Sequence, residues 1–319
     1  MFDLLDEHYG YLSDRAKLER YQSVVDRLVQ PGHVVLDLGC GSGLLGLMAL
    51  RAGARKVLFV EEFSVIEMAR RTVMNTGFGD RAEFFEGRSY DLELPEKADI
   101  VLCDHVGYVG FDYDILRLLA DARERFLKPG GIVVPARIDL MLAPIESQFC
   151  RGLVQRWSND SIPDDFAWVA QSAANTKLAV DLKTDDLIAA SALLGTLELG
   201  EDAGEFFTWT ASFAVSRDAT LDGVAGWFDC VLHDDIHITN APGADDKLDR
   251  PQAFLPIENP ATVKTGQQIN ATVMARPHDY VLAWTIELPE TGQRFEQSTF
   301  KSLRLGNALR KSLSQEPTR

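Results

Sequence analysis

Several residue classes are scarce in this 319-residue chain, and each scarcity excludes a class of protein. Four cysteines are present, and none forms a Cys-x-x-Cys pair, so the sequence predicts neither a metal site nor a disulfide framework. No apolar run approaches the roughly 18 residues that cross a bilayer, and the start shows no signal-peptide pattern. We therefore expect a cytoplasmic protein that contacts no membrane.

Positive charge is also in short supply. Lysine and arginine number 32 against 48 aspartates and glutamates, which gives a formal net charge of −16. Since nucleic-acid binding draws most of its affinity from basic side chains, we expect no nucleic-acid partner. Such a surface attracts a cationic substrate, but an acidic surface is also ordinary for soluble proteins. The charge leaves both interpretations open.

The most informative stretch is Val34–Gly43, with the letters VVLDLGCGSG. An apolar strand containing Asp37 runs into a turn with three glycines, which allow backbone conformations closed to other residues and let a ligand lie against bare backbone. Glu61 ends the next apolar strand, where a carboxylate can accept hydrogen bonds from both hydroxyls of a ribose. This form is typical of class I S-adenosylmethionine-dependent methyltransferases rather than of dehydrogenases.

Strands and helices alternate through the first half of the chain. We expect helices at Ser13–Val29 with Ser13 as N-cap, Leu44–Gly53, Ser64–Gly77 with a capping box at Ser64–Glu67, and Tyr113–Leu127. Expected strands after Glu61 are Ala82–Glu86, Asp99–Cys103 and Ile132–Val134, with a turn at Lys128–Gly131 between the last helix and strand. The alternation predicts a doubly wound, Rossmann-like α/β domain over residues 32–136, preceded by a helical segment in 1–31.

After Pro135 the pattern changes to strand periodicity. Apolar Trp209, Ala211 and Phe213 alternate with polar residues, and similar segments follow to about residue 288. We expect an antiparallel, β-barrel-like domain over 137–319. The stretch 148–177 is irregular and aromatic, so it is either an interaction arm or a loop packed on its own domain. The tail from Asn307 is polar and basic.

Beyond the glycine motif, the chain resembles the protein arginine methyltransferases. His8–Asp14 with Lys17 and Tyr21 is similar to that family's amino-terminal helix, which closes over the cofactor. Asp104–Tyr108 is similar to the start of its substrate loop. Leu127–Pro135 and Asn259–Gly266 also follow its pattern. The resemblance implies S-adenosylmethionine as cofactor, S-adenosylhomocysteine as product, and a homodimer for which 148–177 is the candidate dimerisation arm.

By position, the resemblance assigns the cofactor contacts. They are His8, Lys17, Asp37, Gly39, Gly41, Gly43, Glu61, Ser89 and Tyr90. Lys17 stands where the family has an arginine that pairs with the cofactor carboxylate, and a lysine keeps the charge without the bidentate fork. Asp37 and the glycines bracket the methionine part, and Glu61 the ribose. Ser89 and Tyr90 fall at the adenine, where Tyr90 replaces an acidic residue.

The acceptor loop departs further from the family, which uses two glutamates to hold a permanently protonated guanidinium. Here the first position is Asp104 and the second is Tyr113. The family signature Thr-His-Trp aligns with Leu248-Asp249-Arg250. We assign Asp104 to hold or deprotonate the acceptor and Tyr113 to donate a hydrogen bond. His105 is either a base or a structural histidine.

Two other aspartates of this loop, Asp112 and Asp114, are expected to cap the following helix, although they, or Asp249, could compensate for the missing glutamate. Three hypotheses follow for the function. The first is a protein arginine methyltransferase-like enzyme that methylates a nitrogen nucleophile of a protein or peptide. The second is a methyltransferase for a small molecule or another non-arginine acceptor. The third is a catalytically inactive cofactor-binding scaffold.

Overall fold

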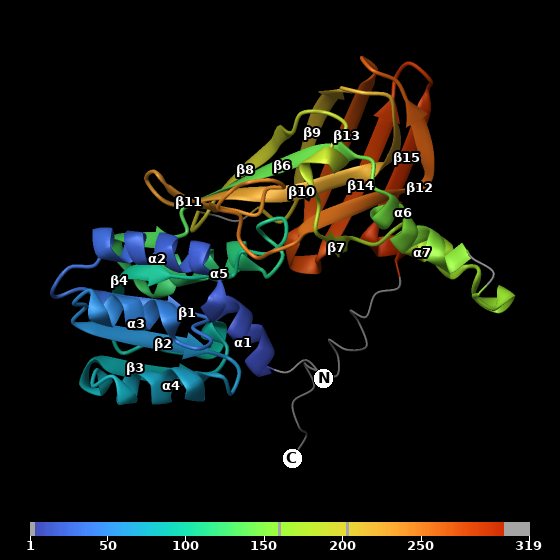
Figure 1. Ribbon diagram of the computed structural model, residues 1–319. Coiled ribbons are helices and arrows are strands. Elements are labelled where there is room, and N and C mark those ends of the chain that lie inside the picture. Colours follow the sequence, from blue (N-terminus) through green and yellow to red (C-terminus); the bar gives the residue numbers. More distant parts are fainter. Residues whose placement is uncertain (1–3, 159–160, 202–203, 303–319) are drawn as a thin grey trace. The chain divides into compact units, whose positions relative to one another are not determined.

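The computed structural model describes residues 4–158, 161–201 and 204–302, and the chain divides into two compact units (Figure 1). Unit 1 comprises Met1–Met141, Gly195–Gly204 and Trp227–Pro251, and unit 2 comprises Leu142–Leu194, Glu205–Gly226 and Gln252–Arg319. Unit 1 therefore includes two segments from the β-rich second half of the chain. The domain bounds 1–31, 32–136 and 137–319 stay a prediction. The tail expected from Asn307 lies outside the described residues.

Unit 1 contains a five-stranded parallel sheet, which confirms the predicted Rossmann-like core. The strands are β1 (Val34–Leu38), β2 (Lys56–Glu61), β3 (Ala82–Glu86), β4 (Ala98–Leu102) and β5 (Leu127–Val134). Their order is β3-β2-β1-β4-β5, so the chain first builds outward from β1 and then returns to place β4 on its other side (Figure 1). The point between β1 and β4, where the winding direction reverses, is the usual ligand site of such sheets.

The described residues of this unit form five α-helices. They are α1 (Leu4–Ser13), α2 (Arg15–Leu28), α3 (Leu44–Arg51), α4 (Ile66–Asn75) and α5 (Ile115–Arg125). Helix α3 contacts β1 and β2, α4 contacts β2 and β3, and α5 contacts β5. Helix α2 buries Tyr21, Val24, Val25 and Leu28, the spacing that places apolar side chains on one helical face.

Three local predictions were wrong. Ser13 ends α1 instead of capping a helix, and the N-cap of α2 is Asp14, whose carboxylate accepts a hydrogen bond from the Lys17 amide. Aspartate and serine cap equally well, so their order could not be told from sequence. No capping box forms at Ser64–Glu67, because α4 begins at Ile66 without a side-chain cap. The expected turn at Lys128–Gly131 lies within β5, which starts at Leu127.

The antiparallel β domain is confirmed, with its strands in two sheets. One has the order β7 (Leu178–Val180), β12 (Gln252–Val263), β10 (Ala219–His233), β6 (Arg137–Ile145) and β8 (Ala192–Glu198), with β11 (Ile236–Thr239) also paired to β10. The other has the order β15 (Gln293–Ser298), β14 (Val281–Leu288), β13 (Gln268–Arg276) and β9 (Phe207–Ala214). The core of unit 2 includes Trp284, whose indole nitrogen donates to the Pro256 carbonyl at 2.7 Å.

The described residues of the stretch 148–177 in unit 2 include the α-helices α6 (Gln148–Gln155) and α7 (Val169–Ala173), where the sequence indicated irregular structure. Cys150 and Val154 are buried on one side of α6. Large aromatic side chains of the same stretch face solvent: Phe149 is 63% exposed, Phe166 53% and Trp168 58%. The stretch is thus packed on its own unit by one face and presents an apolar surface with the other.

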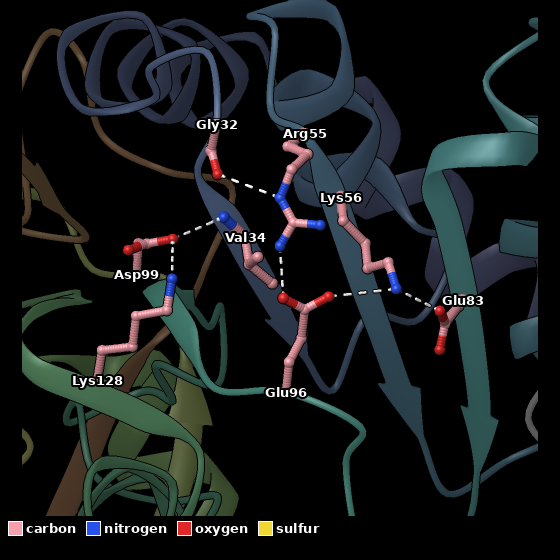
Figure 2. A network of polar contacts seen from close by, with 8 residues as sticks. All are labelled: Gly32, Val34, Arg55, Lys56, Glu83, Glu96, Asp99 and Lys128. Carbon is pink, nitrogen blue, oxygen red and sulfur yellow. Dashed lines mark hydrogen bonds and ion pairs between the residues drawn. The ribbon is translucent and has the colours of Figure 1, made fainter.

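An ion-pair network lies at the amino ends of the parallel strands (Figure 2), whereas Glu61 ends β2 at the carboxyl end of the sheet. Glu96 accepts from Arg55, and its other oxygen lies 3.2 Å from Lys56 Nζ, which also binds Glu83. Asp99 accepts from the Val34 amide at 2.7 Å and from Lys128 at 2.8 Å. These bonds tie neighbouring strands together at the edge where no ligand is expected.

The packing of α3 against β2 yields the first testable prediction. A methyl group at Gly46 would lie 2.2 Å from Phe59 Cε1 and 2.9 Å from an Asp37 oxygen, whereas at Gly10 of α1 it would meet nothing within 4 Å. Gly46→Ala therefore lowers the free energy of unfolding by about 1–3 kcal/mol through overpacking. Gly10→Ala, the matched helical control, leaves it unchanged or raises it by up to about 1 kcal/mol. Urea unfolding followed by circular dichroism measures both, and equal effects would contradict the packing argument.

Candidate cofactor and acceptor site

Acidic side chains gather at the carboxyl ends of three neighbouring strands of unit 1. Asp37 lies next to Phe59 of β2 and Leu102 of β4 in register, Glu61 ends β2, and Asp104 follows β4 by two residues. The parallel direction of the strands brings these ends to one edge, on both sides of the reversal between β1 and β4. The structure thus assembles the carboxylates that the sequence predicted to be functional.

The glycine turn between β1 and α3 has left-handed backbone at all three predicted positions, with φ of 66° at Gly39, 50° at Gly41 and 79° at Gly43. A side chain is excluded for a second reason as well. A Cβ at Gly39 would lie 2.3 Å from His105 Nε2, and one at Gly41 would lie 2.7 Å from His8 Cε1. Two histidines, one from α1 and one from the loop after β4, therefore pack over the bare backbone of the turn.

Asp37 is almost completely buried at 1% exposed, and one carboxylate oxygen accepts a hydrogen bond from the Gly46 amide at 2.7 Å. Burial raises the pKa of Asp37 to about 8, although the Gly46 bond opposes the rise. The negative charges of Glu61 and Asp104 contribute to this rise. The side chain is therefore mostly protonated at neutral pH, and a cation placed beside it would favour loss of that proton.

Glu61 is held by backbone amides on both oxygens. Oε2 accepts from Gly41 at 2.9 Å and Oε1 from Phe63 at 3.0 Å, and the residue is 7% exposed. These bonds fix the direction of the carboxylate and leave lone pairs on each oxygen for a ligand. No cation neutralises it through any contact that the described residues show. The predicted ribose-binding carboxylate is thus preorganised by the same turn that would receive the ligand.

The two residues predicted at the adenine, Ser89 and Tyr90, start the short helix η2 (Ser89–Asp91) after β3. The Ser89 carbonyl accepts from Arg125 at 2.6 Å, which anchors the helix. The Tyr90 hydroxyl is buried and has no hydrogen-bond partner among the described residues. Arg117 lies over the Tyr90 ring, with its guanidinium carbon 4.7 Å from the ring centroid. A buried hydroxyl in this state is free to bond to a ligand base.

On the other side of the reversal between β1 and β4, Asp104 binds two cationic side chains, Lys17 and Arg250. We call these three residues, together with Tyr21, the Asp104 cluster. Lys17 Nζ lies 2.7 Å and an Arg250 terminal nitrogen lies 3.6 Å from the same carboxylate oxygen. The other oxygen accepts from the Tyr21 hydroxyl at 3.3 Å, and that hydroxyl also lies 3.1 Å from the Cys103 carbonyl. Helix α2, the loop after β4 and the loop after β11 meet at this carboxylate.

Electrostatics in the Asp104 cluster oppose the role that the sequence suggested for its carboxylate. Burial alone would raise the pKa of Asp104, but the charges of Lys17 and Arg250 outweigh it and hold this pKa below its ordinary value. The carboxylate therefore stays ionised and is a weak base. Lys17, predicted to bind the cofactor carboxylate, binds Asp104 in this structure, and its nitrogen also lies 4.6 Å from the Tyr11 ring centroid.

Asp14 joins the two segments that supply these cations. One of its carboxylate oxygens accepts from the Lys17 amide at 3.1 Å and the other accepts from the Asp249 amide at 3.2 Å. A pocket of about 480 Å³ lies at this junction and is lined by Ser13–Ala16 and Lys247–Asp249. Asp14 thus fixes the start of α2 and the loop of Arg250 relative to each other.

The remaining candidate residues of the acceptor loop lie between β4 and α5. Burial lowers the pKa of His105, so its imidazole is neutral at neutral pH. Tyr113 is 46% exposed and packs edge-on against Tyr108, with ring centroids 6.5 Å apart. The helix caps predicted for Asp112 and Asp114 do not form. Asp112 accepts from the Val109 amide at 2.8 Å within the loop, and Asp114, at the N-cap with φ 59°, makes no side-chain cap bond.

Sequence reasoning missed three contributors to this site: Asp14, Tyr21 and Arg250. Tyr21 was interpreted as part of an apolar helix face and of the segment that resembles the family helix, and its hydroxyl gave no separate signal. Asp14 lies within the segment that resembles the family helix, but its second oxygen binds a residue 235 positions away. Arg250 offered one usable signal, since it replaces the tryptophan of the family signature. No metal-binding cluster of histidine, cysteine or acidic residues occurs within the described part of the chain.

The sequence and fold match known proteins. Residues 35–131 match the family described as a methyltransferase domain. The chain is 33% identical over 156 residues to the probable protein arginine N-methyltransferase 6.1 of Oryza sativa subsp. indica, a match covering 48% of this chain and 41% of that protein. The matched region thus spans well under half the length of that relative.

Two further matches are longer. The protein arginine N-methyltransferase PRMT10 of Arabidopsis thaliana is 27% identical over 323 residues, covering 90% of this chain and 84% of that protein. A structure described as the Trypanosoma brucei PRMT1 enzyme-prozyme heterotetrameric complex with AdoHcy superimposes with a TM-score of 0.82 at 21% identity, covering 91% of this chain and 96% of that chain. In sequence and fold, this chain is thus similar to protein arginine methyltransferases, and its residues 35–131 match a methyltransferase domain.

Proposed function

We propose that the protein is an S-adenosylmethionine-dependent methyltransferase of the protein arginine methyltransferase-like type that methylates a nitrogen nucleophile. One observation carries the proposal. The glycine turn and the amide-held Glu61 form one preorganised nucleotide site at the strand ends, within the segment that matches a methyltransferase domain. The long match to PRMT10 supports the same activity class.

The residues present fit this cofactor. Glu61 would hold the ribose hydroxyls, the bare turn at Gly39 and Gly41 would receive the methionine part, and the Tyr90 hydroxyl would bond to the adenine. His105 and His8 pack directly against Gly39 and Gly41, so they would border the bound ligand. Bound S-adenosylmethionine supplies an electrophilic methyl group on a positively charged sulfur. Asp37 and Glu61 place negative or ionisable oxygen near that charge.

On the acceptor side, the protein must align the nitrogen and take up one proton. We assign the proton to His105, because its imidazole is neutral whereas Asp104 is an ionised, cation-bound carboxylate of low basicity. Asp104 then acts as a positioning residue, which orients Lys17 and Tyr21 through its bonds to them. Tyr113, partly exposed at the end of the same loop, supplies a hydrogen bond to the acceptor.

The proposal extends to assembly as a homodimer, with residues 148–177 as the arm. Its support is the exposed aromatic surface of Phe149, Phe166 and Trp168 on a segment whose other face is buried in unit 2. Exposed apolar patches on soluble proteins often mark interfaces. Among the described residues, no helix is long and apolar enough to cross a membrane. A cytoplasmic location stays a prediction.

Glu61 provides the test of the activity. The protein is incubated with methyl-labelled S-adenosylmethionine and separate pools of peptides and metabolites, and mass spectrometry locates the label, which we expect on nitrogen.

Glu61→Gln replaces an acceptor oxygen with a donor, and we expect cofactor affinity to fall at least about tenfold in calorimetry. Glu62→Gln, at the exposed neighbouring residue, is the control and should bind normally. Undiminished binding by Glu61→Gln, or no transfer to any pool, would contradict the proposal.

Asp37 makes cofactor binding depend on pH. Because its pKa is raised to about 8, the free protein carries a proton there at pH 6–7. A cationic cofactor favours the ionised form, so binding releases that proton and affinity rises with pH until it levels off above about pH 8. Calorimetry with S-adenosylmethionine from pH 6 to 9 measures the slope, expected at up to about tenfold per pH unit. Asp37→Asn should flatten it, and a persistent slope in this variant would assign the proton elsewhere.

The arm predicts a change in oligomeric state. Trp168→Asp places a charge in the proposed interface, so the variant should sediment as a monomer at concentrations where the wild type is a dimer. Phe206→Asp is the matched control, since Phe206 is similarly exposed at 57% but lies outside 148–177. Analytical ultracentrifugation compares the three proteins. A monomeric wild type, or a dimer that survives Trp168→Asp alone and together with Phe149→Asp, would refute the assignment.

A further inference from the structure

Arg250 belongs to the site, but the proposed methyltransferase function gives it no role. It lies in the loop after β11 and is 9% exposed, although it carries a full charge. One terminal nitrogen lies 3.6 Å from Asp104, and the guanidinium carbon lies 5.8 Å from the Tyr11 ring centroid. The other terminal nitrogen, Nη1, is buried and has no hydrogen-bond partner among the described residues. Leaving such a donor unsatisfied is costly, most of all on a charged group.

The charges of the Asp104 cluster do not balance. Asp104 supplies one negative charge, and its Oδ2 atom is already shared by Lys17 and Arg250. Tyr21 takes the other oxygen as a neutral donor. The cluster therefore has an excess of one positive charge in a nearly buried place. A further cation would meet Arg250 at close range, whereas one carboxylate would balance the charge and accept a hydrogen bond from the Nη1 donor.

From this we infer the acceptor class of the site, an inference that rests on the proposed methyltransferase function. We propose that Arg250 binds a carboxylate of the methyl acceptor and repels guanidinium groups, so that the substrate is a nitrogen compound bearing a carboxylate rather than a protein arginine. A monoanion matches the charge excess, whereas a phosphate dianion overshoots it. Arg250 keeps this role whether Lys17 stays on Asp104 or turns toward the cofactor, because the arginine contacts Asp104 independently.

Three probes of one shape test the inference. They are 4-aminobenzoate, its neutral analogue 4-aminobenzamide and its cationic analogue 4-aminobenzamidine, and each carries the same aromatic amine. Isothermal titration calorimetry measures their binding with and without S-adenosylhomocysteine. For the wild type we expect the carboxylate to bind at least about tenfold tighter than the amide, and the amidine to bind most weakly. Equal affinities, tighter amidine binding or no binding of any probe would overturn the inference.

Variants at Arg250 assign the effect. Arg250→Met should reduce the preference for the carboxylate to less than about threefold and strengthen amidine binding, while Arg250→Lys, which keeps the charge, should retain part of the preference. Arg51→Met, at an exposed arginine that ends α3, is the matched control. A preference that survives in both Arg250 variants would overturn the inference. Failure of the wild type to bind S-adenosylmethionine would instead refute the proposed function. The two failures can be distinguished, because probe binding is also measured without S-adenosylhomocysteine.

Discussion

The ionised carboxylate of Asp104 is the contact on which the site depends. It joins Lys17 and Tyr21 of α2, its own loop after β4, and Arg250 from the loop after β11. These segments are far apart in sequence, and each brings a side chain that is buried or nearly so. A buried ion group holds its members firmly, because removing one partner leaves an unpaired charge out of water. The position of α2 over the acceptor side of unit 1 follows from this requirement.

The site contains two kinds of carboxylate, and the difference decides what each can do. Glu61 is oriented by the amides of Gly41 and Phe63, which are dipoles, so its negative charge remains available to a ligand. Asp104 is oriented by Lys17 and Arg250, which are full charges, so its own charge is already balanced. The cofactor side therefore keeps a binding anion, and the acceptor side does not.

How far the sequence predicted this site depends on the range of the interactions. The glycine turn, Asp37 and Glu61 follow from local patterns, because strand, turn and acidic residue are set within about thirty positions. The parallel sheet follows from the alternation of elements. The partner of Lys17 could not be predicted, since whether its amine binds Asp104 or a ligand depends on a contact 87 residues away. The N-cap of α2 was predicted wrongly for a simpler reason. Ser13 and Asp14 are equally good caps, and only packing selects between them.

The departures from the family pattern at Tyr113 and Arg250 share one electrostatic explanation. In the family that the sequence resembles, two glutamates face a substrate guanidinium, and two negative charges surround one positive charge. Here Tyr113 removes one of these carboxylates, and Arg250 introduces a guanidinium that contacts the other, Asp104. The internal arginine thus takes the electrostatic place of the substrate cation. Restoring only the second glutamate would leave Arg250 in competition with the substrate, and removing only Arg250 would leave a single carboxylate. The two positions act as one determinant of acceptor charge.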